Sequence, residues 1–321
     1  MPAGHAAPGR KAPFHPVTAV ILQIVFSSLV TAGMWLYTPD LPRDELEARY
    51  AGPPSVFVEA DGVRLHMRDT GPRDAPVIIM LHGFGASLHT WEAWAQLLSA
   101  GFRVIRFDLP GFGLTGADPT GDYSDARAMA VLAALMETLQ VRRAILVGNS
   151  MGGRIAWNFA ARYPARVARL VLISPDGFAG AGIAYGQASG VPLTARLLPY
   201  VMPMPLLRAS LAPAYADPQR LTEAVVARYR DMLLAPGVRD AVLARMEQVV
   251  LEDPVPVLRT LHLPVLLLWG EQDHMIPIGN AADYLAALPD ARLVALPGLG
   301  HVPQEESPAE ALEPVQAFLS R

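Results

Sequence analysis

The chain has 321 residues, 52% of them apolar, which suffices for one large domain or for a domain with an insertion. Its formal net charge of −4 gives no electrostatic reason to expect nucleic-acid binding. The absence of cysteine excludes disulfides, thiolate metal sites and a cysteine nucleophile.

The N-terminal region predicts a membrane anchor. Residues 17–37 contain no charged side chain, and as a helix they would span about 31 Å, the thickness of a hydrocarbon core. Arg10 and Lys11 precede this stretch and acidic residues follow it. The positive-inside rule therefore places residues 1–16 in the cytoplasm and the rest on the periplasmic, extracytoplasmic side. A cleaved signal peptide and a buried core helix are the alternatives, but the length of the apolar run favours an uncleaved single-pass anchor.

Residues 38–54 predict a linker with room for one helical turn, because they combine four prolines with a short charged segment. Two alternating stretches then flank a tight turn at Asp61-Gly62 and predict an antiparallel hairpin. The next strand, at 76–81, is apolar throughout, as parallel strands buried on both faces are. These features open the first part of an α/β core, expected over residues 55–176.

Strands that alternate with helices predict a mostly parallel sheet with helices on both faces. Between residues 177 and 258 the sequence shows proline-broken helical segments and no convincing strand, which predicts a helical cap inserted after the sixth strand. Residues 259–321 are expected to complete the core. The remaining strands are expected at 103–107, 144–148, 170–174, 264–269 and 292–296.

Ser150 lies at a corner where a buried strand ends and a helix begins. Glycine at positions 148 and 152 suits that corner, since side chains two residues before and after the serine would collide with the turn. The corner exposes the hydroxyl, and the free N–H groups of the helix N-terminus suit a developing oxyanion. A glycine-rich turn with an idle serine is the alternative, and the strand–turn–helix context favours a nucleophile.

A serine nucleophile needs a histidine base that a carboxylate orients. Asp273 and His301 each follow one of the last two strands, at the sheet edge where parallel sheets hold their ligands. The order Ser150, Asp273, His301 is the one expected for this arrangement. Asp176, after the sixth strand, is the alternative acid. Glu305 and Glu306 are interpreted as a solvated helix start.

Five segments carry a resemblance to a known family: HGFG (82–85), DLPGFG (108–113), GNSMGG (148–153), GEQDHMIP (270–277) and GHVPQEESP (300–308). With them the chain resembles the cap-bearing serine esterases and lipases of the α/β-hydrolase superfamily. The resemblance implies that fold and an oxyanion hole formed by the N–H groups of Phe84 and Met151. It makes Asp108 part of a structural turn. We interpret His82 as a structural residue that bonds the backbone and holds the oxyanion loop. The other residues expected to support the catalytic site are Gly83, Gly148, Asn149 and Gly152.

The predicted function is a membrane-anchored serine hydrolase that cleaves lipophilic, small-to-medium carboxylic esters through an acyl-enzyme. No metal or organic cofactor is called for, no nucleic-acid partner is expected, and the oligomeric state is not predicted. Two alternatives stay open: a non-catalytic binding protein, and a carbon–carbon bond hydrolase of ring-fission products. GNSMGG and LISPDGF resemble the latter, but Val302 stands where those enzymes carry tryptophan, and their oxyanion loop is longer.

Overall fold

The computed structural model describes residues 16–180, 185–188 and 190–320, and the chain divides into two units, Met1–Thr38 and Pro39–Arg321. The described residues of the first unit include the helix α1 (Pro16–Leu36). In the described ranges no helix is both long and apolar enough to cross a membrane, so the anchor predicted at 17–37 is not supported. The predicted cytoplasmic tail lies, apart from Pro16, outside the described residues.

The segment predicted as a linker is a folded part of the second unit. It forms a two-turn helix, α2 (Arg43–Tyr50), whose Leu46 side chain is completely buried. Arg49 of this helix forms an ion pair with Asp231 of α7 (Glu223–Leu233). The prolines misled the prediction because they flank the helix, where proline is tolerated, rather than interrupt it.

The second unit is built on one eight-stranded sheet with the order β1-β2-β4-β3-β5-β6-β7-β8. β2 is antiparallel to both of its neighbours and all other pairs are parallel. The mostly parallel sheet and the opening hairpin are therefore confirmed. The strands are β1 (Ser55–Ala60), β2 (Val63–Thr70), β3 (Val77–Leu81), β4 (Arg103–Phe107), β5 (Ala144–Asn149), β6 (Val167–Ile173), β7 (Val265–Gly270) and β8 (Ala291–Leu296).

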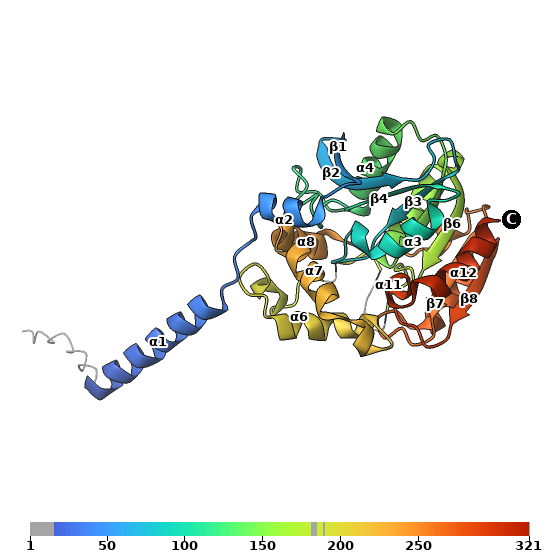
Figure 1. Cartoon of the computed structure of the whole chain (residues 1–321). Coiled ribbons are helices and arrows are strands. Elements are labelled where there is room, and N and C mark those ends of the chain that lie inside the picture. The colour runs from blue at the N-terminus through green and yellow to red at the C-terminus, as the bar shows by residue number, and fades with distance from the viewer. Residues whose placement is uncertain (1–15, 181–184, 189, 321) are drawn as a thin grey trace, which may run out of the picture. The chain divides into compact units, whose positions relative to one another are not determined.

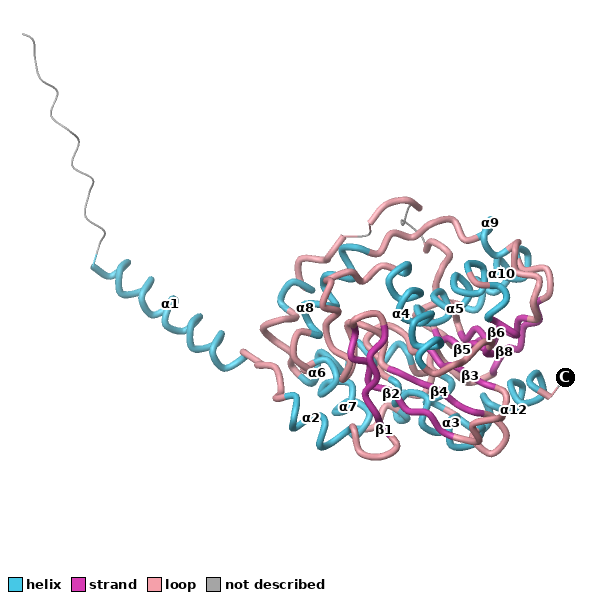
Figure 2. Tube along the Cα trace, turned by 90° about the horizontal axis from the view of Figure 1, so that it is seen from above, coloured by secondary structure: helices cyan, strands magenta, loops and turns pink. Residues whose placement is uncertain are grey.

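Each face of the sheet has its own apolar core, because successive strand residues point to opposite faces. In β3, Ile78 and Met80 pack in the core under α3 and α12, whereas Ile79 and Leu81 pack in the core under α4 and α5. Figure 2 shows helices on both sides of the strands. The helices that flank the sheet are α3 (Glu92–Leu98), α4 (Asp125–Thr138), α5 (Met151–Arg162), α10 (Ala281–Ala287) and α12 (Pro308–Leu319).

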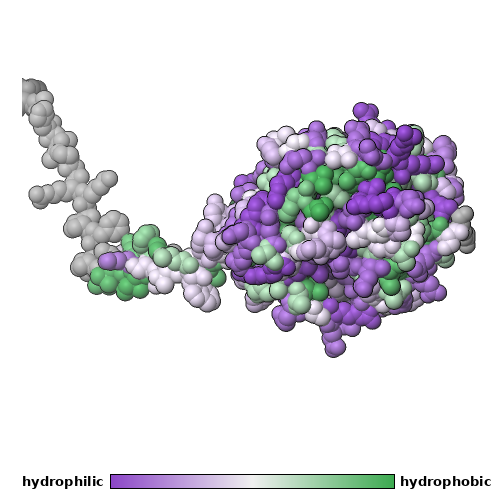
Figure 3. Space-filling model, turned by 45° about the horizontal axis from the view of Figure 1, so that its top comes forward, coloured by the Kyte–Doolittle hydropathy of each residue, from purple (hydrophilic) through white to green (hydrophobic). Residues whose placement is uncertain are grey.

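Between β6 and β7 the described residues form helices and turns (Figure 1). A third apolar cluster holds these elements together and includes Tyr215, Val226 and Leu234, and it also takes in Val302, which follows His301. The helices here are α6 (Met204–Leu211), α7, α8 (Val238–Gln248) and α9 (Val255–Leu258), and α11 (Pro303–Glu306) follows β8. Short 3-10 helices are η1 (Leu88–Trp91), η2 (Pro164–Arg166), η3 (Ala195–Leu197), η4 (Ala212–Ala214), η5 (Pro218–Arg220) and η6 (Ile278–Asn280). The surface view in Figure 3 is largely hydrophilic over this unit, with a compact apolar area on the face shown.

The buried Asp108 carboxylate organises the turn after β4. Oδ1 accepts a hydrogen bond from the Leu88 N–H at 2.7 Å, and Oδ2 accepts one from the Leu114 N–H at 2.8 Å. The His66 ring lies 2.8 Å from Oδ2 and contacts Ser55 Oγ through its other nitrogen. Although these side chains form a Ser–His–Asp row, Ser55 begins a strand rather than a strand-to-helix corner. The row is structural.

We expect the Asp108→Asn variant to be less stable at pH 7 and less sensitive to acid. Burial opposes the charge on Asp108. The interaction with the His66 charge and the hydrogen bond with His66 outweigh this effect, and they lower the pKa of Asp108 to about 2. A carboxyl group with a lowered pKa stabilises the fold above its unfolded value, and this contribution is lost as the pH falls through the folded value. The shift in pKa corresponds to a contribution of about 2 kcal/mol to the free energy of unfolding. Denaturant unfolding between pH 6 and 2 measures it.

The exposed Glu59 supplies the control for this experiment. Glu59→Gln should leave both the free energy of unfolding at pH 7 and its acid dependence close to wild type. Equal acid sensitivity of Asp108→Asn and wild type would contradict the account.

Candidate active site

The backbone at Ser150 has the strained geometry that the sequence predicts. Ser150 connects β5 to α5 with φ 53° and ψ −121°, a conformation that non-glycine residues rarely adopt. A Cβ atom on Gly148 would lie 2.4 Å from the Gly152 carbonyl oxygen, and one on Gly152 would lie 2.2 Å from the Leu81 carbonyl oxygen. Only glycine fits at either position, as predicted.

Two backbone N–H groups beside Ser150 are available to an anion. Met151 is the first residue of α5 and is buried, and Phe84 lies on the loop after β3. Among the described residues, no protein acceptor takes the N–H of Phe84 or of Met151. Both residues line one cavity together with Ser150. This arrangement suits the oxyanion hole that the resemblance implies.

His82 holds the loop that carries Phe84. Its Nδ1 donates to the Gly83 carbonyl at 2.8 Å, and its Nε2 accepts from the Leu109 N–H at 2.9 Å. Burial lowers the pKa of His82, so the ring is neutral and can accept at one nitrogen while it donates at the other. These two contacts with the backbone fit the structural role predicted for His82.

Asp273 and His301 come together on the loops after β7 and β8. His301 Nδ1 lies 2.7 Å from Asp273 Oδ2, and both side chains are almost completely buried. The other carboxylate oxygen, Oδ1, accepts the N–H groups of Met275 and Ile276, each at 2.8 Å. Because the carboxylate accepts the Nδ1 proton, Nε2 of a neutral His301 is left as a proton acceptor.

Asn149 ties the histidine loop to the serine corner. Its side-chain amide donates to the backbone carbonyl of His301 at 2.9 Å and to that of Ile173 at 3.2 Å. The structure thus places His301 beside the residue next to Ser150. Within the described residues no hydrogen bond joins Ser150 Oγ to the His301 ring. Their direct partnership stays a prediction.

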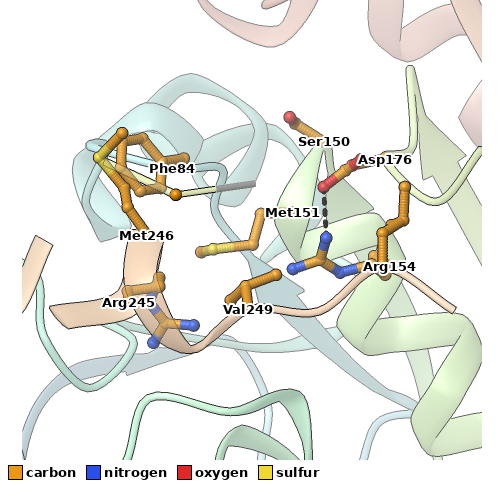
Figure 4. Close-up of a pocket in the computed structure, with 10 residues that line it drawn as sticks. Phe84, Ser150, Met151, Arg154, Asp176, Arg245, Met246 and Val249 are labelled. Atoms are coloured by element: carbon orange, nitrogen blue, oxygen red, sulfur yellow. Dashed lines mark hydrogen bonds and ion pairs between the residues drawn. The ribbon is translucent and has the colours of Figure 1, made fainter. Parts of the chain in front are cut away.

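Asp176, the alternative acid, has a different partner. Its backbone N–H donates to the Ser150 carbonyl at 3.1 Å, and its carboxylate lies 2.6 Å from Arg154 Nη1 (Figure 4). Arg154 also forms an ion pair with Asp125 at 2.9 Å. Burial opposes the charge on Arg154, but the charges of Asp176 and Asp125 outweigh it and raise the pKa of Arg154. The structure therefore assigns Asp273, not Asp176, to His301.

A cavity of about 290 Å³ opens at Ser150. Its lining is mostly apolar, with charged side chains at two places (Figure 4). The lining residues are Phe84, Ser150, Met151, Arg154, Asp176, Gly190, Arg245, Met246, Val249 and Leu251. Sequence reasoning did not single out Arg154 or Arg245, because neither belongs to a strand end where catalytic side chains are sought. In the described part of the chain, no group of three potential metal ligands gathers.

The prediction that Glu305 and Glu306 are solvated is wrong. Glu306 is 5% exposed, and its carboxylate accepts the Gly300 N–H at 2.7 Å. Glu305 accepts hydrogen bonds from Tyr215 at 2.7 Å and from Arg228 at 2.5 Å. Both carboxylates brace the histidine loop against residues that precede β7. The sequence gives no local signal for this, since two acids after a proline are also typical of an exposed helix start.

Comparison with known proteins agrees with this geometry. A family model described as the alpha/beta hydrolase fold matches residues 76–308. The chain is 31% identical over 254 residues to 2-hydroxy-6-oxo-6-phenylhexa-2,4-dienoate hydrolase of Burkholderia cepacia, over 76% of this chain and 86% of that protein. A membrane phospholipase A described as a bacterial virulence factor aligns with a TM-score of 0.71 and 27% identity, over 94% of this chain and 98% of that one. A thermophilic esterase from Thermogutta terrifontis aligns with a TM-score of 0.67 and 25% identity, over 83% and 98%. The chain belongs to the alpha/beta hydrolase family.

Proposed function

We propose that this protein is a serine hydrolase that cleaves carboxylic esters through an acyl-enzyme. The fold and the names of its relatives support hydrolase activity. The observation that carries the finer proposal is the His301–Asp273 pair at 2.7 Å, anchored beside a serine at a strained strand-to-helix corner. A histidine held in this tautomer is the base that a serine hydroxyl needs.

In the proposed reaction, His301 Nε2 takes the Ser150 proton while Oγ attacks the ester carbonyl carbon. The N–H groups of Phe84 and Met151 hold the resulting oxyanion. The alcohol leaves with the proton from His301, and Ser150 keeps the acyl group. His301 then takes a proton from water while the water oxygen attacks the acyl carbon, and it returns this proton to Ser150 Oγ as the carboxylic acid leaves. Asp273 stabilises the imidazolium in both halves.

The cavity supports a lipophilic substrate of small to medium size. Phe84, Met151, Met246, Val249 and Leu251 supply most of its wall. Its volume of about 290 Å³ is near the lower end for small-molecule sites. A short or medium acyl chain fits such a space better than a long one does.

A second candidate is hydrolysis of a carbon–carbon bond in a vinylogous diketo acid. The observation that favours it is the similarity to the Burkholderia cepacia dienoate hydrolase, because serine, histidine and aspartate on this fold serve either reaction. Val302 argues against this second candidate. It is packed in the third apolar cluster, and the carbon–carbon hydrolases that the chain resembles carry tryptophan at this position, directly after the histidine.

One substrate panel separates the two candidates. It contains 4-nitrophenyl esters with acyl chains of two to twelve carbons and one ring-fission dienoate. We expect turnover of the esters with an optimum at short or medium chains and at least ~10-fold lower kcat/KM for the dienoate. Turnover of the dienoate with no activity on any ester would overturn the ester proposal in favour of the second candidate.

The location of the hydrolase unit outside the cytoplasm is also a proposal. It rests on the charges around residues 17–37, with Arg10 and Lys11 before this stretch and Asp40 and Asp44 after it. A C-terminal alkaline phosphatase fusion should be active in cells. An inactive phosphatase fusion beside an active cytoplasmic reporter fusion would overturn it.

A further inference from the structure

Arg245 is a buried cation at the edge of the proposed substrate cavity. It projects from α8 and is 2% exposed. One nitrogen, Nη2, donates to the Pro110 carbonyl at 2.9 Å. The guanidinium also lies over the rings of Phe112 and Tyr123, at 5.2 and 5.7 Å from their centres. In Figure 4 it lies at the opposite end of the lining from Ser150, with Met151 and Val249 between them.

The protein supplies no counter-ion for Arg245. All 30 acidic side chains of the chain belong to described residues, and none forms an ion pair with Arg245. Nε and Nη1 of Arg245 also have no hydrogen-bond acceptor among the described residues. Asp125, whose charge acts on Arg245, is itself ion-paired with Arg154 at 2.9 Å.

Other buried arginines of this chain show what a structural arginine looks like. Arg239, on the same helix and 4% exposed, forms an ion pair with Asp40 at 2.6 Å. Arg154, in the same cavity, has both Asp125 and Asp176. Arg245 alone among these three keeps a charge without a carboxylate. A buried charge without a partner is strongly destabilising, so its retention calls for a ligand that pairs with it.

The charge itself persists at neutral pH. Burial lowers the pKa of Arg245 to about 10, which still leaves the guanidinium protonated. The apolar wall and this single unpaired cation together describe a ligand with an apolar body and one anionic end.

We propose that Arg245 binds a carboxylate on the substrate, so that the preferred ester carries an anionic group at the end remote from the scissile bond. This specificity rests on the proposed ester hydrolysis. The carboxylate completes the hydrogen bonding of a guanidinium that the protein alone leaves incomplete. Arg245 is then a specificity-determining residue, and the ester bond at Ser150 and the anion at Arg245 bracket the apolar part of the substrate.

Matched pairs of esters test the proposal, one pair for each side of the scissile bond. The acyl pair is mono(4-nitrophenyl) adipate against 4-nitrophenyl hexanoate, and the alcohol pair is 4-carboxyphenyl hexanoate against phenyl hexanoate. In one of the two pairs, wild type should prefer the carboxylated ester by at least ~10-fold in kcat/KM. No preference in either pair would overturn the proposal.

Variants of Arg245 locate the preference. Arg245→Met should lower kcat/KM for the preferred anionic ester by roughly 30- to 100-fold and for its neutral partner by less than ~3-fold. The thermal midpoint of Arg245→Met should not fall, because an apolar side chain replaces an unpaired buried charge. Arg239→Met is the control: it should lower the thermal midpoint and leave the ratio between the two esters unchanged. Equal loss on both esters by Arg245→Met would identify a structural role and overturn the proposal.

Binding to the Ser150→Ala variant separates this proposal from the ester proposal. Calorimetric titration should give tighter binding of the carboxylated ester than of its neutral partner, and Arg245→Met in the same background should remove the difference. Anion-dependent binding without turnover by the active protein would sustain the Arg245 site and overturn ester hydrolysis. Ester turnover without anion preference would do the reverse.

Discussion

Replacement of Ser150 by alanine should abolish ester hydrolysis and leave the fold intact. The expected loss in kcat is on the order of 10³- to 10⁶-fold, because the residual rate comes only from binding and the oxyanion N–H groups. The Ser150 hydroxyl makes no hydrogen bond within the described residues, so its removal should change the free energy of unfolding by roughly 0.5 kcal/mol or less. Steady-state kinetics and denaturant unfolding measure the two effects.

A fluorophosphonate probe gives the same test without a chosen substrate. Wild type should be labelled on the peptide that contains Ser150, and Ser150→Ala should not be labelled. Ser174 serves as the control, since it also follows a parallel strand but is completely buried and starts no helix. Ser174→Ala should keep wild-type labelling. Labelled Ser150→Ala protein would place the nucleophile elsewhere.

Asp273→Asn should lower kcat by roughly 10³- to 10⁴-fold. An asparagine amide placed where Oδ2 now accepts the Nδ1 proton would favour the other tautomer of His301, with the proton on Nε2 and no base facing the serine. The asparagine carbonyl oxygen would still accept the N–H groups of Met275 and Ile276. The loop should therefore keep its conformation, and the loss should appear in kcat rather than in stability.

Asp176→Asn is the matched comparison, because Asp176 is the other acid near Ser150. Its carboxylate pairs with Arg154 rather than with His301, so we expect kcat to fall by less than ~10-fold. A larger loss in Asp176→Asn than in Asp273→Asn would exchange the two roles and contradict the assignment drawn from the His301 contact.

The sheet was predictable because its strands are short apolar segments bounded by glycine and charge. The strand at 103–107 has the expected bounds. The strand-to-helix corner at Ser150 was predictable for a steric reason, since a Cβ atom on Gly152 would lie 2.2 Å from the Leu81 carbonyl oxygen. Constraints of this kind depend on residues that are neighbours in the sequence, so the sequence is enough to predict them.

What the sequence did not reveal depends on contacts between distant segments. Leu46 lies in a stretch that looks like a linker, and only its burial in the second unit shows that the stretch is folded. The sequence around Glu306 is typical of a surface helix, and its burial depends on the hydrogen bond that it accepts from the Gly300 N–H. Arg239 and Arg245 are the two arginines of residues 238–245, and nothing in the local sequence marks Arg245 as the one without a carboxylate partner.

A crystal structure of the protein inhibited by an alkyl phosphonate would show the nucleophile, the base and the oxyanion donors of the proposed site together. We expect a covalent bond from phosphorus to Ser150 Oγ, a phosphoryl oxygen about 3 Å from the N–H groups of Phe84 and Met151, and His301 Nε2 about 3 Å from Oγ. Phosphorus on another side chain, or a His301 ring turned away from Ser150, would contradict the proposed roles of Ser150 and His301.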